Sequence, residues 1–160
     1  MNRKAFMLAI VLLLLVGCSK NEVTDMDLQS FISEKNIESY EMIKNDDIYI
    51  FQETKRDLLI YIIKEKKKDK IQYVNQKSSL SKYGITYGCY TKGKFCFYVT
   101  NESVLNNSAS FIVRFADDTE KEYIFNQDQR AYLIESPIIN DRDTTISFFD
   151  SKGSLIYEDR

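Results

Sequence analysis

The spacing of hydrophobic residues changes twice along this chain of 160 residues. Residues 5–16 carry no charged or polar side chain, and residues 24–36 show apolar positions at helical spacing. Beyond residue 38, short segments rich in Ile, Val, Tyr and Phe are separated by turn residues, which is typical of β-strands. The pattern therefore predicts an apolar leader, one short helix and a mainly β region.

The predicted helix has a recognisable start and one apolar face. Thr24 or Asp25 can cap its first turn, because their side-chain oxygens accept hydrogen bonds from free backbone N–H groups. We expect the helix to continue through Asn36 and to pack on a sheet. Its apolar stripe consists of Leu28, Phe31 and Ile32.

The β region predicts a series of antiparallel strands, because most connections hold two to five residues and are too short for parallel crossovers. We expect a meander that forms a two-layer sandwich or a partly open barrel. Residues 58–63 are continuously apolar, which indicates a central strand covered on both faces. The predicted strands are 39–44, 47–53, 57–65, 70–75, 84–91, 94–100, 109–116, 120–126, 131–135, 144–149 and 154–158.

Two hairpins can be assigned a register. A loop of residues 117–119 pairs Arg114 with Glu122, and hence Phe111 with Phe125, whereas a shorter loop would set Arg114 against Lys121. The terminal hairpin places Gly153 where a turn needs positive φ. In that hairpin the predicted pairs are Phe149 with Leu155 and Phe148 with Ile156.

A third hairpin, centred on Lys92 and Gly93, sets Cys89 directly opposite Cys96. Opposed strand residues are close enough for a disulfide. The same two cysteines could also remain reduced as small core residues, or point to opposite faces if the register shifts. Two cysteines without histidine leave a zinc site short of ligands, so we expect no metal.

The leader has the layout of a signal peptide. Arg3 and Lys4 precede the apolar run, which holds 12 residues, whereas a spanning helix needs about 20. The basic pair should stay in the cytoplasm while the following chain is exported. We therefore expect residues 1–17 to be removed.

Residues Leu15-Val16-Gly17-Cys18 resemble the lipobox of bacterial lipoproteins at all four positions. The resemblance covers about 20 residues and implies a diacylglyceryl group on Cys18, cleavage just before it and further acylation, for instance by palmitate. Two or three acyl chains hold a protein at a membrane where one chain exchanges. An ordinary secretory peptide and an uncleaved signal anchor are the alternatives.

Composition limits the exported part, which comprises the spacer 18–24 and one domain over residues 25–160. Removal of the leader leaves 20 of the 22 basic side chains against 24 acidic ones, so we expect no nucleic-acid partner. The chain contains no histidine, the usual general base and metal ligand. We expect no catalytic residues and no cofactor.

Three polar groups could still carry chemistry or binding. Acidic residues at turns, Asp117 and Asp118 with Asp141 and Asp143, could bind calcium, although turns use such residues for ordinary hydrogen bonding. Serine with a lysine base is a second arrangement. Five lysines within residues 64–70 could touch anionic headgroups or form a solvated hairpin tip. The serine group consists of Ser78, Ser79 and Ser81, with Lys82 as the base.

The sequence thus predicts a lipid-anchored module on the outer side of the cell membrane. We expect its β-rich domain to bind an envelope protein or wall component without catalysis, as an accessory, scaffold or inhibitor. One alternative is a small-ligand or lipid-binding β-sandwich, and another is a carboxylate-based hydrolase.

Overall fold

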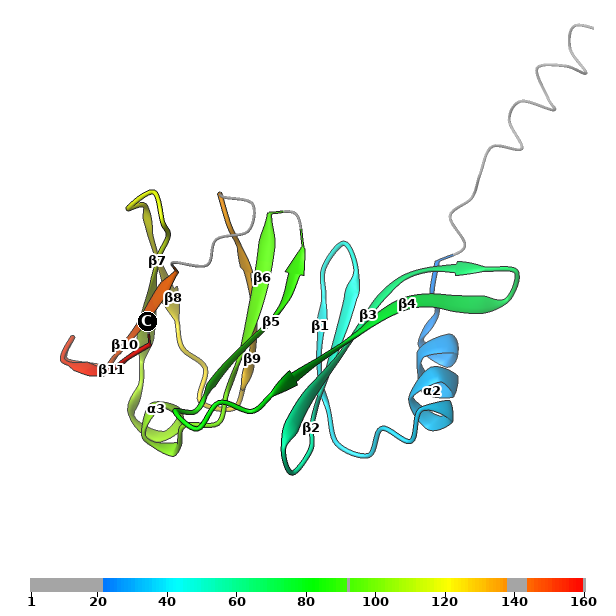
Figure 1. Ribbon diagram of the computed structural model, residues 1–160, viewed down its shortest axis with the longest axis horizontal. Coiled ribbons are helices and arrows are strands. Elements are labelled where there is room, and N and C mark those ends of the chain that lie inside the picture. Colours follow the sequence, from blue (N-terminus) through cyan, green and yellow to red (C-terminus); the bar gives the residue numbers. More distant parts are fainter. Residues whose placement is uncertain (1–21, 92, 138–143, 160) are drawn as a thin grey trace, which may run out of the picture.

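The computed structural model describes residues 22–91, 93–137 and 144–159. It is mainly β, and its strands lie in three antiparallel sheets (Figure 1). The elements, in chain order, are α2 (Asp25–Glu34), β1 (Glu41–Lys44), β2 (Ile48–Glu53), β3 (Asp57–Lys67), β4 (Lys70–Ser79), β5 (Ile85–Thr91), β6 (Lys94–Val99), α3 (Glu102–Asn107), β7 (Ser110–Arg114), β8 (Glu120–Ile124), β9 (Ala131–Glu135), β10 (Thr145–Phe149) and β11 (Leu155–Asp159).

Helix α2 begins where the sequence predicts. The Thr24 hydroxyl accepts a bond from the Asp27 N–H at 3.2 Å, and the Asp27 carboxylate accepts one from the Thr24 N–H at 3.0 Å. This reciprocal capping box satisfies two backbone donors at the helix start. The helix ends at Glu34, and Asn36 beyond it adopts a positive φ of 53°.

The first sheet is a meander in the order β1-β2-β3-β4. Its strand β3 is covered on both faces, as the continuous apolar run predicts. Tyr61 and Ile63 face α2, whereas Ile60 and Ile62 face the neighbouring sheet, and all are nearly inaccessible to solvent. The predicted helix stripe completes the α2 side, since Leu28, Phe31 and Ile32 are buried there.

The other two sheets combine strands that are distant in sequence. The middle sheet has the order β5-β6-β9, and the outer sheet has the order β11-β10-β7-β8. Figure 1 shows the layers in succession: α2, the first sheet, the middle sheet and the outer sheet. The middle sheet is therefore enclosed on both sides, and five of the six residues of β6 are buried.

Aromatic side chains fill the space between the middle and outer sheets. Phe97 stacks on Tyr132 with ring centroids 5.0 Å apart and meets Phe111 edge-on at 5.4 Å. Phe148 completes the contact from the outer sheet. Such pairs contribute beyond their buried area. Three grooves bordered by described residues lie at the surface rather than in this layer, near Tyr73, Ile48 and Met42.

The prediction of a mainly β, antiparallel fold with a short N-terminal helix is confirmed. Each predicted strand is present, and the largest difference is at β4, which continues to Ser79. The structure adds a third sheet to the sandwich and a second short helix, α3, capped by the Asn101 side chain. It also pairs β6 with β9 and β7 with β10, which a pure meander would not do.

The predicted register of the β7–β8 hairpin is wrong by two positions. Arg114 faces Glu120 rather than Glu122, and Phe111 faces Tyr123 rather than Phe125. The loop has three residues, as predicted, but it comprises residues 116–118, with Asp118 at a φ of 63°. An aspartate tolerates this conformation, which moves the turn one residue earlier. Arg114 still gains an acidic partner, at 2.6 Å.

The terminal hairpin agrees with its prediction in part. Gly153 has a φ of 79°, and Phe149 pairs with Leu155 as expected. A bulge between Phe148 and Phe149 then shifts the register, so that Phe148 faces Tyr157 instead of Ile156. The bulge places one extra residue on β11.

The cysteine hairpin also carries a bulge. Cys96 faces Gly88 rather than Cys89, and Cys89 adopts a positive φ of 42°. The structure nevertheless joins Cys89 and Cys96 in a disulfide with their Cα atoms 5.5 Å apart. Both side chains are fully buried between the first and middle sheets. The turn residue Lys92 lies outside the described residues.

We expect this disulfide to stabilise the folded protein. Replacing both cysteines, Cys89→Ser with Cys96→Ser, should lower the free energy of unfolding by about 2 kcal/mol, because the cross-link closes a short loop in the unfolded chain. Urea unfolding followed by fluorescence would measure the change. In the wild-type protein neither thiol should react with a maleimide before reduction, and reaction of both in the native state would contradict the expectation.

Candidate functional site

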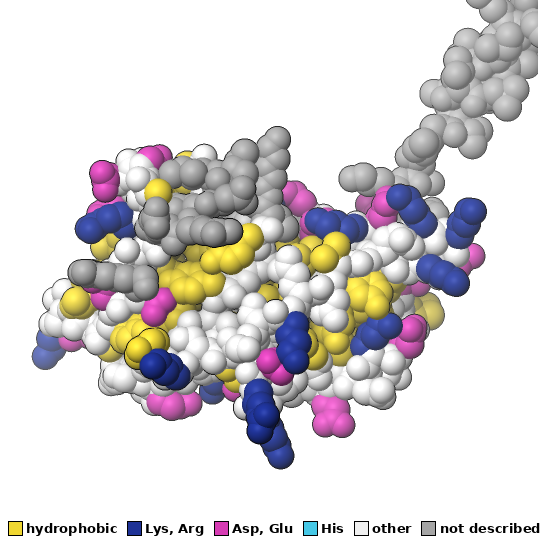
Figure 2. Space-filling model, viewed as in Figure 1, with side chains coloured by type: hydrophobic (Ala, Val, Ile, Leu, Met, Phe, Trp, Pro, Cys, Tyr) yellow, Lys and Arg dark blue, Asp and Glu magenta, His cyan; other side chains and the backbone are white. Residues whose placement is uncertain are grey.

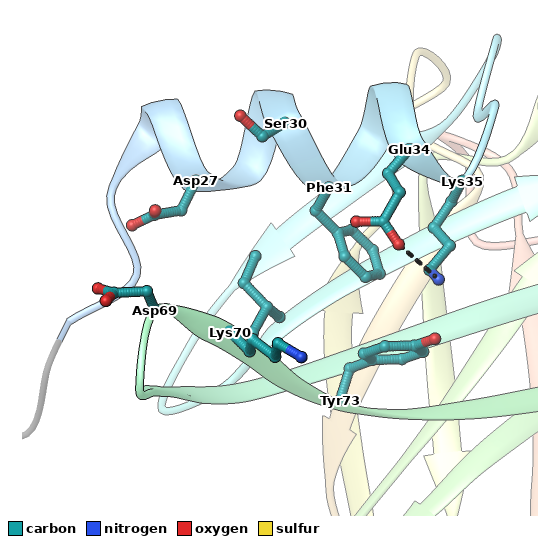
Figure 3. A pocket seen from close by; sticks show the side chains of 9 residues that line it. Asp27, Ser30, Phe31, Glu34, Lys35, Asp69, Lys70 and Tyr73 are labelled. Atoms are coloured by element: carbon teal, nitrogen blue, oxygen red, sulfur yellow. Dashed lines mark hydrogen bonds and ion pairs between the residues drawn. The ribbon is translucent and has the colours of Figure 1, made fainter.

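A surface groove lies between helix α2 and the start of strand β4, with a volume of about 380 Å³ (Figure 3). We call it the α2–β4 groove. Figure 3 shows Asp27 and Asp69 at one end and Glu34, Lys35 and Tyr73 at the other. The groove thus has an acidic end and an end of mixed charge. Its lining residues are Asp27, Ser30, Phe31, Glu34, Lys35, Asp69, Lys70, Ile71 and Tyr73.

Aromatic rings form the apolar part of this groove. Phe31 and Tyr73 meet edge-on with centroids 5.0 Å apart, and Phe31 also contacts Tyr61 beneath it. The Lys35 ammonium lies 5.2 Å from the Tyr73 ring centre and 3.2 Å from the Glu34 carboxylate. Hydrogen bonding to Tyr73 and then to Glu34 raises the pKa of Lys35. The groove therefore places the Lys35 ammonium beside the aromatic rings of Phe31 and Tyr73.

The acidic end is organised by the helix cap. The Lys66 ammonium donates to the Asp27 carboxylate at 2.8 Å, and this bond, with those from Thr24, lowers the pKa of Asp27 to about 2. The capping box holds the carboxylate between helix and hairpin. Asp27 consequently connects α2 to β3.

Strand β4 borders the groove and is the edge of the first sheet. Its only strand neighbour among the described residues is β3. Tyr73 on the α2 side is 38% exposed and Val74 on the opposite side is 45% exposed, so both faces meet solvent at mid-strand. The edge and the groove share Lys70, Ile71 and Tyr73.

The lysine-rich segment 64–70 forms the tip of the β3–β4 hairpin. Lys68 and Asp69 both have positive φ, at 46° and 62°, which gives a tight turn. Figure 2 shows Lys and Arg side chains at this end of the molecule with Asp and Glu among them. Three of the five lysines form ion pairs: Lys64 with Asp47, Lys66 with Asp27, and Lys67 with Glu65. This pairing weakens the attraction to anionic headgroups.

Of the four acidic residues that could bind calcium, the structure describes Asp117 and Asp118, which lie in the turn between β7 and β8. Asp117 accepts bonds from the Thr119 N–H and hydroxyl, which lowers the pKa of Asp117 and fixes the turn. Asp141 and Asp143 lie outside the described residues, as does Cys18. Within residues 22–91, 93–137 and 144–159, no three Cys, Asp or Glu side chains are placed to hold a metal ion together.

The residues of the possible serine–lysine group lie at the end of β4 and in the turn that follows it. Ser78 and Ser79 end β4, and the Ser81 hydroxyl accepts the Tyr83 N–H at 3.2 Å. The Lys82 ammonium lies 4.7 Å from the Tyr83 ring centre. These contacts organise the turn into β5.

Sequence reasoning missed a polar link between the first and middle sheets. The Glu41 carboxylate accepts hydrogen bonds from the backbone N–H groups of Arg130 and Ala131 at 2.8–3.0 Å. Tyr98 donates to Glu53 at 3.2 Å beside it, and burial raises the pKa of Tyr98. These partners lie 45 to 90 residues apart, so no local pattern indicates them.

Comparison with known proteins gives no relative for this chain. No protein-family model, curated protein or solved structure matches it.

None of the helices in the described part of the chain combines the length and the apolar character that crossing a membrane requires.

We expect Asp27 to make folding stability depend on pH. Its pKa of about 2 in the folded protein lies below the value near 3.9 of an unfolded chain, so its contribution is complete above about pH 4 and is lost as the pH falls toward 2. Asp27→Asn should therefore lower stability at pH 7 and flatten its pH dependence between 4 and 2. Urea unfolding of both proteins across this range would measure it.

At pH 2 the two proteins should differ least, which is an internal control for the loss of the charged form. A difference between them that stays constant from pH 7 to pH 2 would show that the Asp27 charge does not stabilise the fold.

Proposed function

We propose that this chain is a lipid-anchored protein of the cell envelope whose β-rich domain binds a partner on the outer side of the membrane. The observation that carries the proposal is the run Leu15-Val16-Gly17-Cys18 directly after a short apolar leader. A leader of this length is too short for a stable spanning helix, and acyl chains on Cys18 would supply the anchor instead.

The position of the first helix supports a close tether. Five residues separate Cys18 from Thr24, the residue that caps α2. Five extended residues span at most about 18 Å, so the domain would stay beside the bilayer. An accessory or scaffold role suits a domain held at that distance.

The α2–β4 groove supports binding rather than catalysis. It presents paired aromatic rings, the Lys35 ammonium and carboxylates at both ends. The sequence contains no histidine to act as a base at neutral pH. Aromatic surface rimmed by charges is typical of protein interfaces, so the proposed partner is an envelope protein or wall component.

The anchor can be tested on the precursor. Cys18→Ala should leave an unprocessed chain, because the modified cysteine is the substrate for cleavage, and globomycin should have the same effect on the wild-type chain. Mass spectrometry of the mature amino end should find an acylated Cys18 in the wild type.

Cys96→Ala provides the matched control, since it removes another cysteine and should leave processing intact. A mature protein with an unmodified thiol at Cys18, or with residues 1–17 still attached, would overturn the proposal.

A further inference from the structure

Strand β4 is an unusually open sheet edge. It runs for ten residues, and it has no strand neighbour on its outer side within the described part of the chain. Its six central residues between Lys70 and Lys77 include no charge and no proline. The bulge of this hairpin falls on β3, at Lys64, so β4 itself is regular. Natural edge strands are usually blocked by one of these devices, because a free edge pairs with other chains.

We propose that a second copy of this chain pairs with β4 edge to edge, in antiparallel orientation across a two-fold axis at Tyr73. The two four-stranded sheets would then join into one, with main-chain hydrogen bonds across the new boundary. A two-fold axis uses the same surface on both copies, which one exposed strand can supply.

Charge selects the register. With Tyr73 opposite its own symmetry mate, Asp69, in the turn directly before β4, comes near Lys77 of the second copy, and the reverse pair forms on the other side of the axis. Asp69 is fully exposed and lies 4.0 Å from Lys66, and the Lys77 ammonium, which pairs with Asp57 at 2.9 Å, is 64% exposed and would gain Asp69 as a second acidic partner. Lys70 lies opposite Gln76, so no like charges meet. Centring the axis on Val74 would set Lys77 against Ile71 and lose both complementary pairs.

In this dimer the α2 helices of the two copies are placed so that both lipid anchors can enter one membrane. This step rests on the proposed function. Helix α2 covers one face of the first sheet, and the chain enters the domain at its amino end (Figure 1). A two-fold axis perpendicular to that sheet keeps both helices on the same side. Both tethers therefore point to the same bilayer, which an axis in the plane of the sheet would not allow.

The second copy would also complete the binding surface. Tyr73 and Ile71 lie on the α2 side of β4 and line the groove together with Asp69 of the preceding turn. Pairing at Tyr73 would join the two α2–β4 grooves into one trough between two helices, with both Tyr73 rings at its centre. The partner of the proposed function would then meet a two-fold symmetric site.

Cross-linking of the full chain tests the register. Tyr73→Cys should form an intermolecular disulfide on mild oxidation of membranes, because residues opposed across antiparallel strands lie within disulfide range. A band at twice the monomer mass should appear on a non-reducing gel and vanish on reduction. Tyr83→Cys is the matched control: Tyr83 is 61% exposed, lies beyond the end of β4, and should stay monomeric.

Sedimentation of the wild-type protein in detergent should give a dimer mass independently of any substitution. The proposal is overturned if the wild type sediments as a monomer, if Tyr73→Cys cross-links no better than Tyr83→Cys, or if Tyr73→Cys joins a chain of a different mass. If the protein is a dimer without lipid, the pairing at β4 is supported and the lipid anchor is contradicted. If it is an acylated monomer, the anchor is supported and the pairing is contradicted.

Discussion

The fold depends on covering both faces of the three-stranded middle sheet. Strand β6 is buried along almost its whole length, and Phe97 points to the outer sheet while Cys96 points to the first sheet. A three-stranded sheet with two apolar faces cannot remain in water, because each exposed face would forfeit the free energy gained by burial. The first and outer sheets supply the two covers.

The way the middle sheet is covered determines which surfaces of the first sheet remain free. The first sheet uses one face for the middle sheet, so its other face needs α2, which packs through Phe31 and its neighbours. One helix is too narrow to cover all four strands, so β4 is left exposed beside it. Tyr73 on β4 contacts Phe31 of the helix and remains partly exposed to solvent. The α2–β4 groove and the open edge are thus consequences of the layer order.

Polar contacts then fix how the first and middle sheets are aligned. Two apolar faces can slide over one another, whereas the Glu41 carboxylate has a defined position because it accepts the N–H groups at the start of β9. The Lys94 ammonium on β6 also forms an ion pair, at 2.8 Å, with the carboxylate of Asp46 in the β1–β2 turn. The proposed tether enters this unit through α2, so the anchor and groove belong to the same layer.

The sequence by itself determined the helix capped by Thr24, the succession of strands along the chain and the burial of strand β3 on both faces. Caps, turns and apolar runs act within a few residues, so local chemistry specifies them. The register of the β7–β8 hairpin and the bulges beside Cys89 and Phe149 were decided by the conformations of single turn and bulge residues, which pairing rules alone do not specify. The third sheet, the contacts of Glu41 and the exposed edge of β4 exist only after distant segments pack together. Which strand stays at an edge depends on how many faces the other layers can cover, and that is a property of the whole tertiary structure.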